Sequence, residues 1–327
     1  MTTSELIRLL SDGNYHSGEQ LGEQLGVSRT AIWKQLKKLE AVGVSSEAVK
    51  GQGYRLVSPI ELLDGPRIVS ALSKEPRRHL ARLFVEESVA STNSFLRERF
   101  SQGVGHAEIC VAEEQSAGRG RRGRQWLSAW GQGLALSIGW RFKDGATALK
   151  GLSLAIGVVI AQVLECHGLR VALKWPNDVL MLSVDGEKRK LAGILVELNG
   201  DVSGACEVVA GIGLNIVLPP SLRDRLDQPV AAVSEQWPEA SRNVLAADLI
   251  EALLGLMTGF EKDGFDAWQR EWNQRNAYSG CVIEVIQNAQ RYTAIDEGVD
   301  NEGNLCVRRD NELFRLVGGE ISLRAHS

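Results

Sequence analysis

The sequence has few cysteines, and none of them are paired at metal-binding spacing. Its five cysteines are widely separated along 327 residues, and no Cys-x-x-Cys pair occurs. An odd number at wide spacing argues against a disulfide framework or a zinc site and fits reduced thiols in the cytosol. We therefore expect a cytoplasmic protein held together by the packing of its own apolar residues.

Long apolar runs are also missing. Residues 1–5 are polar and lack the apolar core of a signal peptide. The longest mostly apolar stretch, 152–164, is interrupted by Ser153, Gly157 and Gln162 and is too short to cross a bilayer. We expect no association with a membrane.

Three common catalytic signatures are absent. The five histidines are scattered, and neither Gly-x-Ser-x-Gly nor His-Glu-x-x-His occurs, so hydrolase triads and zinc-protease sites have little support. A P-loop is lacking, and the glycine-punctuated segment 211–215 lacks the third glycine and the helix of a dinucleotide fingerprint. Use of a nucleotide therefore needs a different phosphate-binding segment.

The remaining composition is that of a globular protein. Hydrophobic residues make up 44% of the chain and charged residues 24%, which is enough to form buried cores. A chain of 327 residues predicts two or three domains, and we place them at 1–58, 59–273 and 274–327. The net charge of −4 argues neither for nor against a nucleic-acid partner.

The first segment has the pattern of a winged helix-turn-helix domain. Ser4 can cap a short helix, Ser17 opens a capping box at the start of a second, and Ser28 caps a third. Only two residues separate the second helix from the third, which is typical of the helix-turn-helix motif. Two short strands, 44–49 and 54–57, would form the wing.

Charge is unevenly distributed within this segment. Residues 1–28 carry one basic and four acidic side chains, whereas residues 29–55 carry six basic and two acidic ones. The positive charge therefore falls on the later part of the helix-turn-helix (Gly18 to Lys37) and on the wing, where DNA phosphates would be met. The alternative is a solvated helix face in a small interaction domain, but capping, turn length and charge together favour DNA.

The central segment mixes strands and helices. We expect helices at 92–100, 147–166 and 243–261, and strands ending at Ala112 and covering 134–140, 171–174, 191–198 and 207–216. The strands at 171–174 and 191–198 would be joined across Asp185-Gly186. The stretch 219–230 has two prolines and no apolar period, so it is a candidate mobile loop.

The last segment contains only short alternating runs. They lie at 281–286, 292–295, 305–308 and 313–316, with turn signals between them. Several short strands within about 50 residues predict a small barrel.

The strongest candidate for a binding site is the loop 118–124, which has four arginines and three glycines in seven residues. Glycines let the backbone approach an anion, and guanidinium groups bind phosphate or carboxylate oxygens in pairs. An RNA-binding Arg-Gly segment is the alternative, but such segments are long and lie in polar surroundings. This single copy is followed by Trp126, Trp130 and an amphipathic strand, which favours a small-molecule anion site.

Three further clusters offer polar groups at strand ends. Asn177 and Asp178 in the segment 174–178 offer oxygens to a ribose, a base or Mg²⁺, although a purely structural turn is equally compatible. Lys190 opens an apolar strand. An isolated lysine there would most often be a solvated strand end, but beside an anion loop it would hold a carboxylate and then neutralise a phosphoryl oxygen. Glycines in 211–215 indicate the close approach of a ligand or another backbone.

Taken in order, these motifs resemble those of a known family. Ser91-Thr92-Asn93, the loop 118–124, the segment 174–178 and Lys190 to Leu195 recur in this order in biotin protein ligases. The winged helix and the segment 318–324 resemble the bifunctional bacterial subclass that also represses the biotin operon.

The resemblance implies an α+β fold with three parts: an N-terminal winged helix-turn-helix, a central mixed-sheet ligase domain like class II synthetases, and a C-terminal SH3-like barrel. It also implies that biotin and Mg-ATP form biotinyl-5′-AMP. A lysine on the biotin carboxyl carrier protein of acetyl-CoA carboxylase then displaces AMP. The adenylate-bound form would dimerise and bind palindromic operator DNA, so the adenylate is both intermediate and corepressor.

Site residues follow by matching position. Biotin and the acyl phosphate would be bound by Ser91, Thr92, Asn93, Gln115, Arg119, Gly120, Arg121, Lys190, Gly211 and Gly213. The nucleotide would be bound by Arg119, Arg121, Arg124, Trp126, Asn177, Lys190 and Asn215, with Trp126 stacked on the adenine. Arg121 and Lys190 would be catalytic, Asp178 would bind Mg²⁺, and the stretch 219–230 would fold over the adenylate. Arg29, Thr30, Trp33 and Lys34 would lie near the DNA groove.

Two other functions share parts of this pattern. One is a transcriptional regulator whose ligase-like domain only senses a ligand, and the intact Arg-Gly loop with Lys190 argues against it. The other is a lipoate-type ligase, which shares the fold and the adenylate chemistry. The winged helix, the small barrel and the Arg-Gly loop favour biotin.

Overall fold

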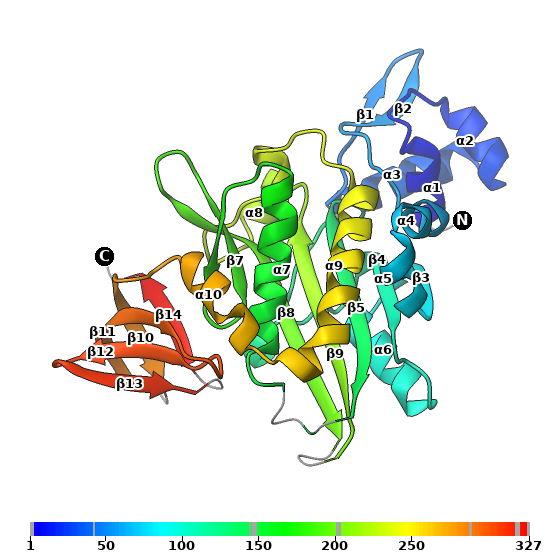
Figure 1. The fold of residues 1–327 in the computed structure, drawn as a ribbon. Helices are drawn as coiled ribbons and strands as arrows, with labels where there is room; N and C mark the ends of the chain where they lie inside the picture. The colour runs from blue at the N-terminus through cyan, green and yellow to red at the C-terminus, as the bar shows by residue number, and fades with distance from the viewer. Residues whose placement is uncertain are drawn as a thin grey trace.

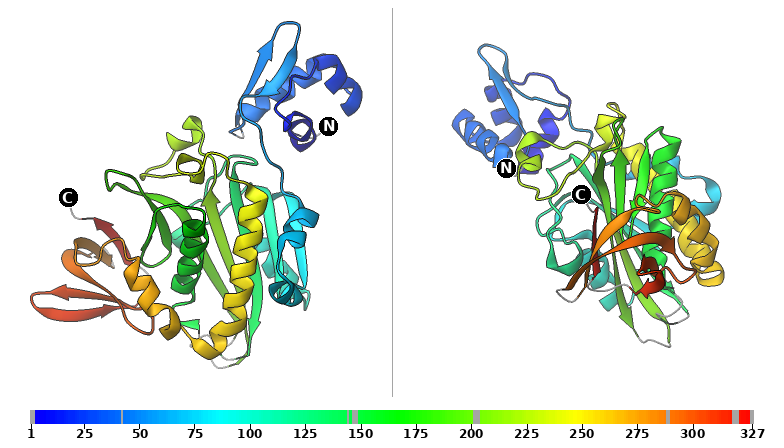
Figure 2. Two further views of the ribbon diagram at one scale, coloured as in Figure 1. Left: turned by 45° about the horizontal axis from the view of Figure 1, so that its top comes forward. Right: turned by 90° about the vertical axis from the view of Figure 1, so that its left-hand side faces the viewer.

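The computed structural model has three parts in a row, with a central sheet between an N-terminal helical unit and a small C-terminal sheet (Figure 1). The structure describes residues 3–41, 43–143, 145, 149–200, 204–287, 290–317 and 321–325. The N-terminal unit projects from the body of the molecule, and one linker segment connects the two (Figure 2). The two also touch: Arg8 pairs with Glu87 at 2.6 Å, and Gln132 donates to Gly43 O at 2.9 Å.

The N-terminal unit is a winged helix-turn-helix, as expected. It consists of α1 (Thr3–Leu10), α2 (Gly18–Leu25), α3 (Arg29–Ala41), β1 (Ser46–Val49) and β2 (Gly53–Leu56). The capping box between Ser17 and Gln20 is present, and Gly26 ends α2 in the left-handed conformation at φ 65°. One expected cap is wrong: α1 already includes Thr3, so Ser4 lies inside the first turn of that helix.

The central unit is built on a seven-stranded sheet. Its strands are β3 (Arg82–Val89), β4 (Glu108–Gln115), β5 (Gly133–Phe142), β6 (Val171–Lys174), β7 (Asp178–Leu182), β8 (Lys188–Gly200) and β9 (Cys206–Asn215). They lie in the order β3-β4-β5-β9-β8-β7-β6, and only β3 and β4 are parallel.

Strand β7 was missed by the sequence analysis. The turn at Asp185-Gly186 therefore joins β7 to β8, and not 171–174 to 191–198. The reason is physical: residues 179–181 are all buried and form a continuous apolar run, so the alternation that identifies a half-exposed strand is absent. The segment 174–178 is consequently the tight connection between the antiparallel strands β6 and β7.

Helices cover both faces of the sheet. The helices are α4 (Gly65–Ala71), α5 (Lys74–His79), α6 (Thr92–Ser101), α7 (Leu152–Cys166), α8 (Pro220–Arg223), α9 (Arg242–Asp263) and α10 (Asp266–Gln274). Helices α7 and α9 lie side by side on one face (Figure 1), and α6 packs on β4, β5 and β9 from the other. Helix α7 is described from Leu152, later than the expected start at 147, and Gly151 precedes it in the left-handed conformation.

Helix α9 is long and apolar enough to cross a membrane by length and composition alone. In the structure 61% of its most apolar window is buried. It packs against α7 and β5, so its apolar residues form part of the protein core.

The C-terminal unit is one antiparallel sheet of five strands in the order β13-β12-β11-β10-β14. The strands are β10 (Val282–Gln287), β11 (Gln290–Val299), β12 (Leu305–Arg309), β13 (Glu312–Leu316) and β14 (Ile321–Ala325). Four of them match the expected runs, and β14 is the last part of the segment 318–324, whose residues 318–320 lie outside the described residues.

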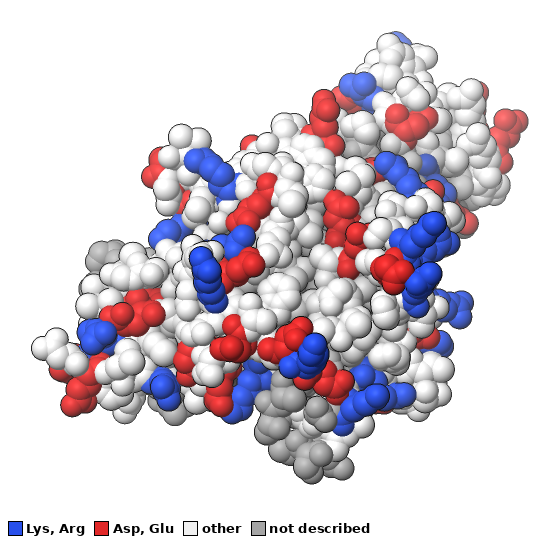
Figure 3. All heavy atoms as spheres, viewed as in Figure 1, with Lys and Arg blue, Asp and Glu red and all other residues white. Residues whose placement is uncertain are grey.

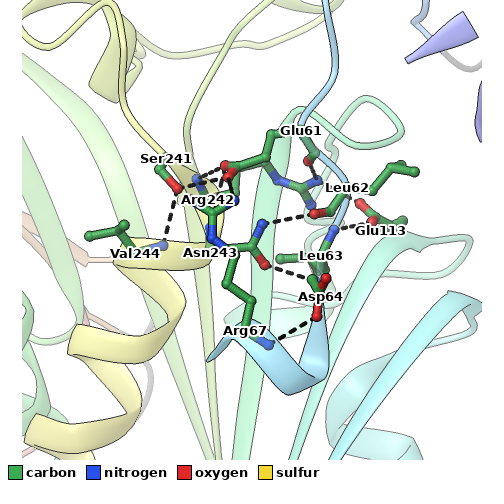
Figure 4. A network of polar contacts seen from close by, with 10 residues as sticks. All are labelled: Glu61, Leu62, Leu63, Asp64, Arg67, Glu113, Ser241, Arg242, Asn243 and Val244. Atoms are coloured by element: carbon green, nitrogen blue, oxygen red, sulfur yellow. Dashed lines mark hydrogen bonds and ion pairs between the residues drawn. The ribbon is translucent and has the colours of Figure 1, made fainter. Parts of the chain in front are cut away.

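A buried arginine fixes the linker between the first two units (Figure 4). Arg242, at the start of α9, pairs with Glu113 of β4 at 2.6 Å and donates to the carbonyl oxygens of Glu61 and Gly133. Glu113 in turn accepts from the backbone N–H of Leu63 at 2.6 Å. Linker residues 61–63 are therefore bound to β4 at Glu113. Gln115 lies two residues further along the same strand.

Candidate functional site

One cavity brings together all the residues that the sequence analysis assigned to small-molecule binding. Its volume is about 160 Å³. The assigned residues in its lining are Ser91, Thr92, Asn93, Gln115, Arg119, Gly120, Arg121, Arg124, Trp126, Asn177, Asp178, Lys190, Gly211, Gly213 and Asn215. They come from segments more than 100 residues apart, so the fold itself assembles the site.

Sequence reasoning missed several lining residues. These are mainly apolar or carry no chemical signature, and they include Leu127, Trp175, Pro176, Ile194, Leu195, Ile212, Leu226 and Val230. They give a polar site an apolar wall, which suits a ligand with both a ring system and an anionic group. All but Leu127 had an indirect signal, because they lie in the segments 174–178, 190–195, 211–215 and 219–230 that the sequence analysis had singled out.

The start of α6 forms a buried polar chain at one end of the cavity. Gln115 accepts from the backbone N–H of Thr92 at 2.8 Å and from its hydroxyl at 3.1 Å. Ser137, which the sequence analysis did not select, donates its hydroxyl to Asn93 Oδ1 at 2.6 Å, and its Oγ lies 2.7 Å from Thr92 Oγ1. Thr92, Asn93 and Ser137 are nearly inaccessible to solvent, so their donors and acceptors are held in fixed directions.

The Arg-Gly loop folds back on itself as a narrow ladder. The N–H of Trp126 donates to Gly118 O at 2.9 Å, and the N–H of Gly120 donates to Arg124 O at 2.7 Å. A Cβ on Gly118 would lie 2.5 Å from the carbonyl oxygen of Trp126. Glycine is thus required at this position for the close backbone approach that forms the loop.

The arginines of the loop point in different directions. Arg119 donates to Ser94 Oγ at 3.1 Å and pairs with Glu197 at 3.2 Å, outside the main cavity. Arg121 is the half-buried one of the four, and burial lowers the pKa of its guanidinium while nearby Asp178 raises it. The desolvated charge of Arg121 is accordingly the one best placed to attract an anion into the cavity.

Lys190 and Asp178 face each other across the hairpin of β7 and β8. Lys190 Nζ lies 2.8 Å from Asp178 Oδ1, and both side chains are largely buried. Lys190 Nζ also lies 5.7 Å from the centre of the Trp126 ring. The Lys190 ammonium, which would contact an anionic ligand, is therefore held in place by the Asp178 carboxylate and the Trp126 ring.

Glycines in β8 and β9 make room for side chains of the site. A Cβ on Gly213 would lie 2.3 Å from the Trp126 ring, and one on Gly211 would lie 2.1 Å from Asn93 Oδ1. The sequence analysis expected a close approach at this strand, and the approaching groups are these two side chains. The glycines thus set the depth at which Trp126 and Asn93 sit.

Two of the predicted nucleotide ligands brace the backbone around the cavity. Asn177 donates to Ile194 O at 2.8 Å, and Asn215 donates to Ala231 O at 3.0 Å. Each amide keeps its oxygen as a possible acceptor toward the cavity.

The stretch 219–230 contains the short helix α8 and passes over the cavity. Leu226, Gln228 and Val230 line it, and the N–H of Lys190 donates to Pro229 O at 3.0 Å. The stretch is therefore tied to the backbone of the same lysine whose side chain enters the site.

The four residues expected at DNA lie together on one face of α3. Arg29, Thr30, Trp33 and Lys34 are all exposed, Trp33 to 50%, while Ile32 and Leu36 on the opposite face are buried. An exposed tryptophan beside basic residues is unusual for a solvated helix face and suits contact with a groove. On the face drawn in Figure 3, by contrast, basic and acidic side chains are interspersed.

Comparisons with known proteins agree with this geometry. Residues 85–215 match the biotin/lipoate A/B protein ligase family, and residues 2–55 match a helix-turn-helix domain. The biotin protein ligase from Aquifex aeolicus in complex with biotin and ATP shares the fold at a TM-score of 0.63 and 24% identity, covering 76% of this chain and 100% of that one. The class is thus a protein ligase fused to a DNA-binding module.

Two relatives extend the similarity over nearly the whole chain. The bifunctional ligase/repressor BirA of Salmonella typhimurium is 40% identical over 321 residues, and that of Escherichia coli K12 is 38% identical over 322 residues. Each alignment covers 98% of this chain and 97% of the relative. The chain belongs to the biotin protein ligase family, in its subclass of bifunctional ligase/repressors, which confirms the resemblance inferred from the sequence.

Proposed function

We propose that the cavity forms biotinyl-5′-AMP from biotin and ATP and retains it until a carrier lysine displaces AMP. One observation carries this assignment: Arg121 and Lys190, from segments about 70 residues apart, enter the same cavity as the polar chain at Thr92 and Asn93. Attack of a carboxylate on the α-phosphate joins two anions, so fixed cations at that point lower the barrier.

Roles follow from the directions of the side chains. The buried donors and acceptors at the start of α6 suit the polar ring of biotin, and Trp126 offers a flat surface to the adenine. Arg121 and Lys190 lie where the carboxylate and the phosphate would meet. An entering anion would compete with Asp178 for Lys190, so substrate binding would release the Asp178 carboxylate.

The Mg²⁺ ion would be bound mainly by the phosphates of ATP and by water. Asp178 is the one acidic side chain among the residues that line the cavity. In the described part of the chain, no three His, Cys, Asp or Glu side chains lie close enough together to bind a metal ion. A site with one carboxylate fits the way Mg²⁺ binds with nucleotides. When bound, the ion would neutralise phosphate charge and leave the positioning of the reacting groups to the protein.

The partners of the protein follow from the same assignment. The acceptor is the biotin carboxyl carrier protein of acetyl-CoA carboxylase, and the exposed face of α3 binds the operator of the biotin-synthesis genes. The adenylate-bound form acts as a homodimer, so that two winged helices meet a palindromic site. We place the protein in the cytoplasm, without a membrane partner, with domains at 1–58, 59–273 and 274–327.

Incubation of the full chain with ATP, labelled biotin and an acceptor domain tests the enzyme. The chain should label the acceptor lysine, and Arg121→Gly should release the adenylate so that lysines of a bystander protein are labelled as well. Mass spectrometry of both proteins measures the ratio of the two products. An Arg121→Gly chain that labels only the carrier lysine would show that Arg121 does not retain the intermediate.

The same incubation tests the repressor. Affinity for DNA carrying the promoters of the biotin-synthesis genes should rise when biotin and ATP are both present, because the adenylate drives dimerisation. Arg124→Gly is the matched variant from the exposed end of the loop and should change both readouts less than Arg121→Gly. Equal DNA affinity with and without the adenylate would contradict the corepressor assignment.

A further inference from the structure

Glu197 lies outside the main cavity, yet its carboxylate collects donors from two parts of the site. It is on β8, four residues beyond Gly193, and its side chain is 21% exposed. Oε2 accepts from Asn93 Nδ2 at 2.8 Å and from Arg119 Nη2 at 3.2 Å, and Oε1 accepts from Arg97 Nη1 at 3.4 Å. Three donors thus converge on one carboxylate.

The two ends of this cluster belong to different halves of the site. Asn93 is buried at the start of α6, where its oxygen accepts from Ser137. Arg119 opens the Arg-Gly loop and has a side chain that is 42% exposed. With only its hydrogen bond to Ser94 Oγ at 3.1 Å, and no carboxylate, a loop arginine this exposed would sample more rotamers, and the first residues of the loop would move with it.

Charge makes Glu197 suited to this position. A carboxylate has about four lone-pair sites and no donor, so it can accept from an amide and two guanidinium groups at once. Glu197 pairs with the exposed Arg119, whereas Asp178, which pairs with Lys190, is the carboxylate whose charge acts on the half-buried Arg121. Two neighbouring positive charges of the loop are therefore each influenced by a different carboxylate.

We propose that Glu197 is a positioning residue of the ligase: it closes the Arg-Gly loop through Arg119 and orients Asn93, and so retains the acyl-adenylate. This rests on the proposed function, because it concerns how long that intermediate stays in the cavity. Glu197 itself is not among the residues that line the cavity.

Two substitutions separate the links. Glu197→Gln keeps an acceptor for Asn93 but offers an uncharged amide to Arg119, so the intermediate should escape roughly two- to fivefold faster, with the KM for biotin nearly unchanged. Glu197→Ala removes both links and should also raise the KM for biotin. Escape is measured as the ratio of bystander to carrier labelling and as the rate of adenylate loss after dilution.

Glu207→Gln is the matched control. Glu207 lies on the neighbouring strand β9, is 23% exposed and pairs with Arg141 at 3.0 Å, away from the cavity. Its variant should melt at a temperature similar to that of Glu197→Gln but retain the adenylate as the parent chain does. If Glu197→Gln and Glu207→Gln retain it equally, the proposal is overturned.

A double-mutant cycle with Arg119→Gln tests the coupling. If Glu197 acts through Arg119, the double variant should lose the adenylate no faster than the faster single variant, whereas independent effects would multiply and overturn the proposal. Carrier labelling by the parent chain keeps the two hypotheses apart. A parent that labels no carrier contradicts the proposed function, whereas a labelling parent with an unaffected Glu197→Gln variant contradicts only the role of Glu197.

Discussion

The ligase core meets its two neighbours in different ways. Toward the winged helix, the linker is bound by the Arg242–Glu113 pair, whose side chains are only 3% and 5% exposed. Toward the C-terminal sheet, the chain leaves α10 and runs beside β6: Leu173 donates to Arg275 O at 2.7 Å and accepts from the N–H of Ala277 at 2.8 Å. One junction depends on buried charge and the other on backbone pairing.

Each junction also touches the binding site, but through different parts of it. Trp130, four residues after Trp126, is 3% exposed and packs within the apolar core of the winged helix together with Ile60. On the other side, Trp175 lines the cavity and donates from its ring N–H to Gly303 O at 3.1 Å. The segment that follows the Arg-Gly loop therefore packs into the DNA-binding unit through Trp130. The C-terminal sheet instead contacts the site through the hydrogen bond between Trp175 and Gly303.

This difference between the junctions predicts which of them a single substitution can disrupt. Backbone hydrogen bonds persist through most substitutions, so the C-terminal junction should tolerate them. A buried ion pair behaves differently, since removal of one partner leaves an uncompensated charge in the interior. The N-terminal junction should therefore be the fragile one, and it is the junction that a repressor needs to hold its winged helices in register.

The largest effect is expected from Arg242→Met. It leaves Glu113 buried and without its cation, which should lower the free energy of unfolding by about 3–5 kcal/mol. Arg275→Met is the matched variant at the C-terminal junction: Arg275 is 18% exposed and pairs with the more exposed Glu165. It should cost about 1 kcal/mol or less.

Urea denaturation measures both variants, and Glu113→Met combined with Arg242→Met sharpens the result. The double variant should recover part of the loss, because it removes the orphaned carboxylate. Equal losses for Arg242→Met and Arg275→Met would remove the distinction between the junctions.

A smaller effect is expected from Trp130→Ala. Loss of this buried aromatic should cost about 3 kcal/mol, the lower end of the range for buried tryptophans, chiefly in the attachment of the winged helix. Operator binding should consequently fall more than carrier labelling does. Trp268→Ala, on α10 at the C-terminal side, lowers apolar packing without touching the winged helix and should leave the ratio of the two activities unchanged. Parallel losses of both activities in Trp130→Ala would show that the tryptophan only supports the ligase core.

Local signals predicted much of this architecture. The capping box at Ser17 and the short turn between α2 and α3 were predicted correctly, because each depends on residues within one or two helical turns. The family motifs also identified the polar residues at the start of α6, in the Arg-Gly loop and at Lys190 that line the cavity, but not its apolar wall. Strand β7 escaped because a strand buried on both faces shows no alternation.

The junctions could not be predicted from the sequence. Arg242 and Glu113 are 129 residues apart, and neither has a local signal that distinguishes it from a solvated helix start or a strand end. Ser137 and Glu197 were missed for the same reason. Each of these residues matters because the fold brings a distant partner next to it. Such tertiary contacts leave no periodic pattern in the sequence.

The smallest predicted effect is on the pH dependence of stability, which should have opposite signs at the two junctions. At the N-terminal junction burial alone would raise the pKa of Glu61, but hydrogen bonds from Asn243, Ser241 and the Arg242 backbone lower it below its ordinary value of 4.5. On the C-terminal side, burial raises the pKa of Asp296 above 3.8, against hydrogen bonds from Gly298 and Asn276. The Asn276 segment is the one that pairs with β6.

The two carboxylates therefore contribute to stability in opposite directions. Glu61 stabilises the fold above pH 4.5, and this contribution is lost as the pH falls through its lowered folded-state pKa. Asp296 binds a proton more readily in the folded than in the unfolded protein, so its contribution is greatest below pH 3.8 and declines as the pH rises through its raised folded-state pKa.

Two variants test this difference. On acidification, the stability that the parent gains over Glu61→Gln should fall, whereas the stability that it gains over Asp296→Asn should rise. Urea titrations at several pH values from about 3 to 6 measure both slopes, with exposed Glu75→Gln as the control for general acid effects. Slopes of the same sign would mean that the two junctions respond to acid alike, and that buried charge does not distinguish them.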